Sequence, residues 1–254
     1  MEMSNLLWIF DSVLLVLPLG WTYSSDVGTR FKSVNGGFNS PVLALDIEGY
    51  PYVNDGSNWR KISNEVFTNI SPGKTGTWAI TRKGRVLKGS ILSRKTQEMI
   101  WIPQSVNSVI MLESGYSDFV TGIDSSSVLL LRNGDDSPFT KYNAEVQYVT
   151  AGAYGIWYLD KDGDVFFSRY WKETDGIRFD KIPGKFKQID TGRHNEVYGI
   201  KKNGSVYRRH GVSGRNPTGS TWIFLSDTNL KSISSGNDGI YGVNQDGQII
   251  RKDG

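Results

Sequence analysis

The sequence repeats one unit of about 40 residues six times, and this repeat restricts the possible folds more than any other feature. The clearest copy lies between Lys181 and Arg209. It contains an apolar alternation that ends in glycine (KFKQIDTG), a second apolar segment (EVYGI), a turn (KKNG) and a third segment that ends in basic residues (SVYRR). The same order returns near the C-terminus as NLKSISSG, GIYGV, NQDG and QIIRK. A period of this length is typical of four-stranded propeller blades.

Four weaker copies precede these two, and each keeps the order of the segments. Their first segments read FKSVNGG, VFTNISPG, SVIMLESG and EVQYVTAG. The glycines that close the six first segments are Gly36, Gly73, Gly115, Gly152, Gly192 and Gly236. The aromatic residues that open a fourth segment between copies are Trp21, Trp59, Trp101, Phe139, Phe179 and Trp222. Each copy therefore supplies four short strands.

Local chemistry agrees with strands and tight turns rather than helices. The chain has 29 glycines and 12% aromatic residues, a composition that suits many short strands. Asp162-Gly163, Asn203-Gly204 and Asp246-Gly247 are signals for two-residue hairpins, in which Asn, Asp and Gly tolerate positive φ. We therefore predict an all-β, six-bladed β-propeller with four antiparallel strands in each blade, because stacked blades cover the apolar faces that no single copy can bury.

The order of the segments also predicts how the ring closes. If the first segment is innermost and the aromatic segment outermost, the last copy lacks its outer strand, and WTYSS at residues 21–25 supplies it. The N- and C-terminal strands then pair in one blade, within a single propeller over residues 21–254. Deleting residues up to about 25 should unfold or oligomerise the protein, whereas deleting residues up to about 19 should not.

Residues 1–20 form a separate apolar N-terminal segment. The run from Leu6 to Gly20 suits the core of a signal peptide. However, the preceding MEMSN lacks a basic residue and Asp11 interrupts the run, so an N-terminal arm remains an alternative. The run is shorter than the roughly 20 residues of a membrane span, and we expect none. Secretion is the favoured localisation and the cytoplasm the alternative.

The charge and cysteine content exclude several function classes. The chain has 29 basic and 26 acidic residues without a basic run, which argues against nucleic-acid binding. It has no cysteine, so disulfides, thiolate metal sites and a thiol nucleophile are absent. Asp and Glu fall mostly in turns rather than in converging pairs, which argues against a glycoside hydrolase.

The copies over Phe179 to Arg251 resemble the repeat of the tectonin lectins, a family that includes tachylectin-1 and the fish-egg lectins. That repeat reads W-x-x-I-P-G-x-L-x-x-I-x-x-G, then V-W-G-V-N, then x-I-Y-R. The resemblance implies a six-bladed propeller that binds glycans without catalysis, often microbial or modified surface sugars, with a role in innate defence. Ile-Pro-Gly is complete only at residues 182–184, and Tyr198 and Tyr241 replace the second tryptophan. The number of working sites is therefore expected to be below six.

The candidate ligand-binding residues are those that suit a sugar. Aromatic faces cover the apolar C–H surface of a sugar ring, and arginine adds geometry for hydroxyl or acidic groups. The aromatic candidates are Trp78, Trp157, Tyr198 and Tyr241, and the arginines that end the third segments are Arg132, Arg169, Arg209 and Arg251. His194 is a further loop candidate. The alternative is that the aromatic residues pack between blades and the arginines pair with carboxylates.

No cofactor is expected, although DKDGD at Asp160 to Asp164 leaves a weak surface calcium site open. An EF-hand loop needs glycine and glutamate where this chain has Val165 and Trp171, and the slot is a hairpin turn in other copies. The favoured function is a carbohydrate-binding lectin, as a monomer or small homo-oligomer, with glycans or polysaccharide as partners. The alternative is a protein-interaction scaffold on the same fold.

Overall fold

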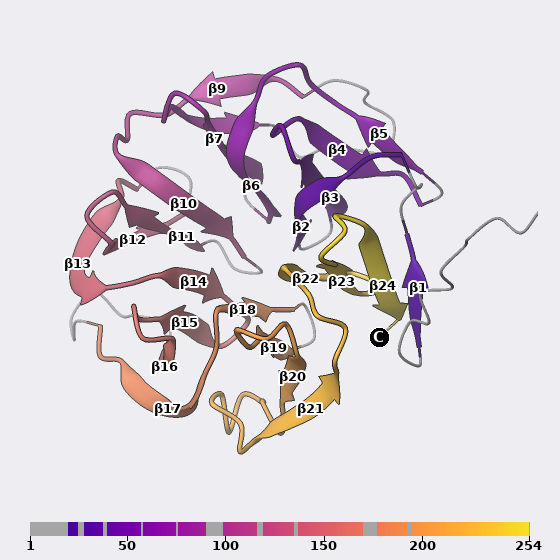
Figure 1. Ribbon diagram of the computed structural model, residues 1–254. Helices are drawn as coiled ribbons and strands as arrows, with labels where there is room; N and C mark the ends of the chain where they lie inside the picture. Colours follow the sequence, from indigo (N-terminus) through magenta and orange to yellow (C-terminus); the bar gives the residue numbers. More distant parts are fainter. Residues whose placement is uncertain are drawn as a thin grey trace, which may run out of the picture.

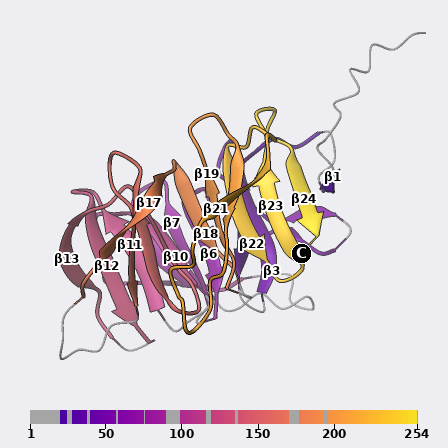
Figure 2. The ribbon, with the colours of Figure 1, turned by 90° about the horizontal axis from the view of Figure 1, so that it is seen from below.

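The computed structural model describes residues 20–24, 28–37, 40–56, 58–74, 76–89, 99–115, 119–134, 137–169, 177–192 and 195–253. These residues form six four-stranded antiparallel sheets that follow one another around a ring (Figure 1). The predicted six-bladed propeller is confirmed. Figure 2 shows the ring from the side, with loops on two opposite faces. No helix long and apolar enough to cross a membrane occurs in the described part of the chain.

The first three blades each use four consecutive strands. Blade 1 contains β2 (Phe31–Gly37), β3 (Ser40–Asp46), β4 (Pro51–Asn54) and β5 (Trp59–Lys61). Blade 2 contains β6 (Phe67–Gly73), β7 (Gly76–Thr81), β8 (Val86–Gly89) and β9 (Trp101–Pro103). Blade 3 contains β10 (Val109–Ser114), β11 (Phe119–Asp124), β12 (Val128–Asn133) and β13 (Thr140–Glu145).

The last three blades repeat this order, except that blade 6 takes its outer strand from the other end of the chain. Blade 4 contains β14 (Tyr148–Ala151), β15 (Gly155–Leu159), β16 (Asp164–Arg169) and β17 (Asp180–Lys185). Blade 5 contains β18 (Gln188–Thr191), β19 (Val197–Ile200), β20 (Val206–Arg209) and β21 (Trp222–Ser226). Blade 6 contains β22 (Ser232–Gly236), β23 (Gly239–Val243), β24 (Ile249–Asp253) and β1 (Trp21–Tyr23).

The ring closes through β1 and β24, as the sequence predicts. The two strands pair antiparallel, with Trp21 opposite Lys252 and Tyr23 opposite Ile250. Figure 1 shows β1 at the outer edge of blade 6, next to β24. The segment before Gly20, interpreted above as a signal peptide or an arm, lies outside the described residues.

The hydrophobic core lies between the blades rather than within one. In one cluster, Leu43 and Val53 of blade 1 pack with Phe67 and Ile70 of blade 2, and all four are buried. The innermost strands of neighbouring blades approach closely, and this contact explains the glycine at the end of the first segment. A Cβ atom on Gly115 would lie 2.0 Å from the Ala151 carbonyl oxygen of the next blade. At Gly36, Gly73 and Gly115 a neighbouring backbone therefore occupies the side-chain position, whereas at Gly152, Gly192 and Gly236 neighbouring side chains occupy it.

The hairpin between the second and third strands differs from the two-residue turn predicted above. In blade 4 the Asp160 N–H donates to the Asp164 carbonyl (3.1 Å) and the Gly163 N–H donates to the Asp160 carbonyl (3.0 Å). Asp160 Oδ1 also accepts from the Asp162 and Asp164 N–H groups, both at 2.9 Å. Among Asp160 to Asp164, only Gly163 has positive φ (80°). The loop thus has three residues, and its first Asp caps the turn instead of tolerating positive φ.

Blade 3 places a serine where the other five hairpins have glycine, and this gives a testable stability prediction. Ser127 has φ 63°, in the left-handed region that is costly for residues with a Cβ atom. We expect Ser127→Gly to raise the free energy of unfolding by about 0.5–1 kcal/mol, measured by chemical denaturation. Ser126→Gly, one residue earlier and without positive φ, should lower it. A loss of stability in Ser127→Gly would contradict this account.

Candidate functional site

The strand register places the four candidate aromatic residues at equivalent positions in four blades. Each lies on the second strand, opposite the residue two places before the glycine of the first segment. The pairs are Trp78 with Ser71, Trp157 with Thr150, Tyr198 with Asp190 and Tyr241 with Ser234. Blades 1 and 3 have Ala44 and Thr121 there. Four of the six blades therefore have an aromatic residue at this position.

The two tryptophans are covered by protein. Trp78 has no exposed surface and packs edge-on against Phe139 at 5.9 Å, with the Arg132 guanidinium 4.9 Å from its ring centre. Trp157 is 2% exposed and lies against Phe167, with ring centres 4.8 Å apart. Both rings fill the junction that follows their blade. The packing role considered in the sequence is therefore present at Trp78 and Trp157.

The four candidate arginines do not occupy one equivalent position. Arg251 lies directly opposite Tyr241, whereas Arg208, rather than Arg209, lies opposite Tyr198. In blade 3 the residue opposite Thr121 is Leu131, which is one place before Arg132. In blade 4 the residue opposite Trp157 is Phe167, which is two places before Arg169. An offset of one residue turns a side chain to the other face of its sheet. Arg132 and Arg209 thus face the preceding blade and Arg251 the following one.

The arginine side chains also differ in their partners. Arg251 pairs with Asp238 (3.3 Å) and Asp253 (2.6 Å). Arg132 donates to the Gly134 carbonyl at 3.1 Å, and Arg169 is exposed. Arg209 is buried, donates to the Thr218 carbonyl at 2.7 Å and lies over the Trp222 ring. Burial lowers the pKa of the Arg209 guanidinium.

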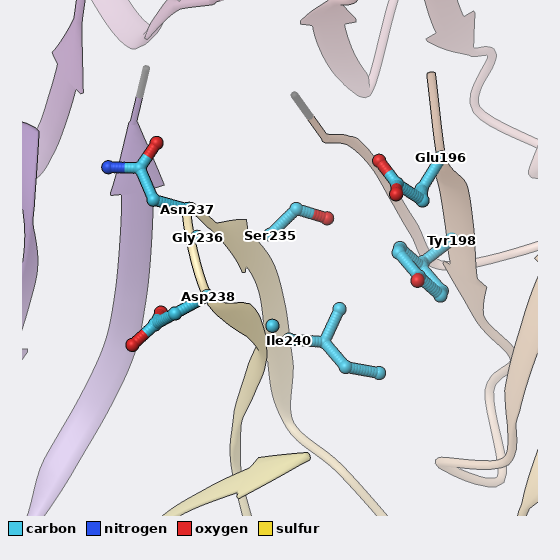
Figure 3. A pocket seen from close by; sticks show the side chains of 8 residues that line it. Glu196, Tyr198, Ser235, Gly236, Asn237, Asp238 and Ile240 are labelled. Carbon is cyan, nitrogen blue, oxygen red and sulfur yellow. The ribbon is translucent and has the colours of Figure 1, made fainter. Parts of the chain in front are cut away.

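A cavity beside the candidate residue Tyr198 lies between blades 5 and 6. It measures about 210 Å³ and is lined by Glu196 and Tyr198 of blade 5 and by the β22–β23 hairpin of blade 6, from Ser235 to Ile240. Figure 3 shows Ser235 and Ile240 turned toward Tyr198, whereas Asn237 and Asp238 point to the other side of the hairpin. Burial, as the first cause, raises the pKa of the Tyr198 hydroxyl, so it remains a hydrogen-bond donor at neutral pH.

Ser235 brings a polar group without a partner into this cavity. Its side chain is buried, and its hydroxyl makes no hydrogen bond with the described residues. The hydroxyl is close enough to help lower the pKa of Asp190, but that carboxylate takes its short hydrogen bond (2.6 Å) from the Ser235 N–H instead. A buried hydroxyl usually has a partner, because leaving it unpaired costs free energy. The Ser235 hydroxyl is therefore a candidate hydrogen-bonding group for a ligand in this cavity.

A second cavity, of about 120 Å³, lies at the next junction, between blades 6 and 1. Its wall includes Tyr241, Asp238 and Asn237 of blade 6 and Ser40 and Asn54 of blade 1. The buried Ser40 hydroxyl, like that of Ser235, makes no hydrogen bond within the described part of the chain. The Tyr241 hydroxyl donates to Asp238 at 3.1 Å, and burial, with the Asp238 charge second, raises its pKa to about 12.

The junction between blades 4 and 5 has the same aromatic wall but almost no free space. The cavity beside Trp157 is only about 10 Å³, because Val212 and Pro217 from the β20–β21 loop close it. Arg209 holds this loop through the Thr218 carbonyl. In blade 6 no loop joins the third and fourth strands, since they come from opposite ends of the chain. The loop thus explains why the Trp157 junction is filled and the Tyr198 junction is not.

The acidic turn at Asp160 to Asp164 is a hairpin, as favoured above. Asp160 accepts from its own turn, and Asp164 pairs with Lys181 (2.8 Å) and Lys185 (3.1 Å). These lysines, Lys181 first, lower the pKa of the Asp164 carboxyl. Within the described ranges, no group of three or more His, Cys, Asp or Glu residues is arranged to hold a metal ion. His194 lies outside the described residues, so its predicted role remains a prediction.

Sequence reasoning identified Tyr198 and Tyr241 but missed the polar residues beside them. Ser235, Glu196 and Ser40 line the two cavities, together with Asn237 and Asp238. The signal was weak: each lies in or next to a loop between the first and second strands, and these loops differ less in length than the loops between the third and fourth strands. The sequence does not show which of these loops lies beside an open junction.

Comparison with known proteins agrees with the repeat pattern. The family model of the Tectonin domain matches residues 30–229. A fish-egg lectin from Cyprinus carpio is 22% identical over 125 residues. The match covers 45% of this chain and 52% of the lectin, so it spans about half of the lectin's length. Among solved structures, yeast RCC1 in a complex with Kap60 aligns with a TM-score of 0.54 at 14% identity, over 84% of this chain and 67% of RCC1. A structure of YCF48 bound to D1 peptide aligns with a TM-score of 0.57 at 10% identity, over 92% and 96% of the chains. Identities this low show a shared fold alone.

Proposed function

The chain belongs to the tectonin family, and from this premise we propose that it is a lectin that binds carbohydrate without catalysing a reaction. The observation that carries the proposal is the Tyr198 cavity. There an aromatic side chain, a carboxylate and a buried hydroxyl without a partner line one small space between two blades.

This combination suits a sugar better than it suits other small ligands. The tyrosine ring offers apolar surface to C–H groups, and Glu196 accepts hydrogen bonds from hydroxyls. The Ser235 hydroxyl can both donate and accept. The Tyr241 cavity repeats the set with Asp238 and Ser40. We further propose that the targets are microbial or modified surface glycans, bound outside the cell in innate defence.

The test removes the free hydroxyls, because their loss should not harm the fold. A buried hydroxyl without a partner contributes little to stability, so Ser235→Ala and Ser40→Ala should unfold like the parent protein or at slightly higher temperature. We expect each variant to weaken binding to the glycans that a glycan array identifies by about 3- to 10-fold at its own cavity. Isothermal titration calorimetry measures this change.

Ser114→Ala is the matched control. The Ser114 hydroxyl is also buried and makes no hydrogen bond among the described residues, but Ser114 lines neither cavity. Its variant should bind like the parent protein. An array without any bound glycan would overturn the proposal, and if a protein partner is then lost in Ser235→Ala, the chain is an interaction scaffold instead.

A further inference from the structure

The two cavities are separated only by the hairpin between β22 and β23. Gly236 pairs with Gly239 across this hairpin, so the turn itself consists of Asn237 and Asp238. Both of these residues line the Tyr198 cavity and the Tyr241 cavity. One turn of two residues is thus a wall that the two cavities share.

Glycine keeps this wall thin. A Cβ atom on Gly236 would lie 3.0 Å from the Tyr241 ring and 3.2 Å from Val42, which also lines the second cavity. A Cβ atom on Gly239 would lie 2.3 Å from the Lys252 carbonyl oxygen. No side chain at either end of the turn therefore thickens the wall between the cavities.

The wall is also held in place. Asp238 accepts from the Tyr241 hydroxyl and pairs with Arg251, and the Asn237 side-chain amide donates to the Ser40 carbonyl at 3.2 Å. These contacts connect the turn to its own blade and to blade 1. A ligand that crosses the turn therefore meets polar groups in fixed positions, which lowers the cost of binding.

Each cavity is small for a complete ligand. Ligand pockets usually measure about 300–1,000 Å³, whereas these measure about 210 and 120 Å³. Each also has its own tyrosine, carboxylate and free serine hydroxyl. The same set of groups on both sides of a shared wall suits a ligand whose own units repeat.

We propose that the two cavities form one extended site for a linear, neutral oligosaccharide, which places successive sugar units on the two sides of the Asn237-Asp238 turn. This inference rests on the proposed function. Neutral chains are specified because Glu196 puts a carboxylate on the wall of the Tyr198 cavity, which repels an acidic sugar. The positive charge of Arg251 beside the turn is already balanced by Asp238 and Asp253.

The experiment measures binding against chain length. Oligomers of one to six units of β-1,4-linked N-acetylglucosamine, β-1,3-linked glucose and α-1,6-linked mannose are titrated into the full chain by isothermal titration calorimetry. For the series that binds, affinity should rise by about 100-fold or more at the length that first spans both cavities, since the second contact becomes intramolecular. At that length the number of oligosaccharide molecules bound per protein chain should fall by one, because one molecule then occupies both cavities.

Variants then locate the long ligand. Ser235→Ala and Ser40→Ala should each weaken the spanning oligomer, whereas for a single sugar unit each should affect only the binding event at its own cavity. Ser114→Ala should change neither. Binding of the single unit with no gain in affinity and no change in stoichiometry on lengthening would overturn the extended site and leave the lectin function standing. A gain in affinity with length that neither Ser235→Ala nor Ser40→Ala reduces would overturn the extended site as well. Failure of all three series to bind would also overturn the extended site, whereas the lectin function is decided separately by the glycan array.

Discussion

A chain that lacks residues 1–25 should fail to form a monomeric propeller, whereas a chain that lacks residues 1–19 should fold. The longer deletion removes β1, whose Trp21 is 5% exposed and packs with Ile200, Leu230 and Ile250. It also removes Ser24, whose carbonyl accepts from the Trp59 indole of blade 1 and whose N–H donates to the Ile249 carbonyl. Loss of these contacts leaves β24 with an unpaired edge and an exposed apolar cluster. Circular dichroism and light scattering would show unfolded or oligomeric protein.

Point variants of β1 separate the side-chain contribution from the loss of the strand. Trp21→Ala should lower the free energy of unfolding by about 3–5 kcal/mol, the usual cost of removing a buried tryptophan. Tyr23 lies on the same strand but is 42% exposed, so Tyr23→Ala should cost less than about 1 kcal/mol. A monomeric, cooperatively unfolding product of the longer deletion would show that the ring does not depend on β1.

The sequence was sufficient to predict the ring because the number of repeat copies sets the number of blades, and the order of segments within a copy sets the strand order. The closing role of β1 followed from one missing aromatic segment in the last copy, and the pairing of Trp21 with Lys252 confirms it. The turns were predicted in the right places but with the wrong geometry. Asp-Gly and Asn-Gly occur both in two-residue turns and in the three-residue turns found here, and dipeptides alone do not separate the two.

The site was only partly predictable for two physical reasons. First, the sequence shows only that several third strands end in a basic residue, and it does not fix the position of that residue to within one place. A difference of one place puts Arg209 and Arg251 on opposite faces of their sheets. Second, the free volume at a junction depends on a loop from elsewhere in the blade. Val212 and Pro217 fill the Trp157 junction, but their own positions in the sequence give no sign of it.

The protein should become less stable as the pH rises from about 4 to about 7, because of two buried carboxyl groups near the ring centre. Glu113 and Asp190 lie on the inner strands of blades 3 and 5, and both are buried. Burial, followed for Glu113 by the charge of Asp190, raises the pKa of both groups, and that of Asp190 to about 7. Burial first, and then the charges of Glu113 and Asp190, raise the pKa of the Tyr148 hydroxyl well above its usual range.

The direction of the effect follows from proton binding. An unfolded Asp or Glu loses its proton near pH 4, whereas in the folded chain Asp190 holds its proton up to about pH 7 and the pKa of Glu113 is also raised. Between these values the folded state binds more protons, so the free energy of unfolding falls as the pH rises and levels off above the folded pKa. For Asp190 alone, a shift of about three pKa units corresponds to about 4 kcal/mol.

Amide variants isolate this contribution. Asp190→Asn keeps an acceptor for the Ser235 N–H (2.6 Å to Asp190 Oδ2) but cannot ionise. Glu113→Gln likewise removes the ionisable group on blade 3. We expect the double variant to lose most of the fall in melting temperature between pH 4.5 and pH 8 and to melt above the parent protein at pH 8. Asp180→Asn, at an exposed carboxylate on β17, should keep the parent profile. A double variant whose profile matches the parent would show that both carboxyl groups already ionise in the folded ring at the pH values of unfolded Asp and Glu.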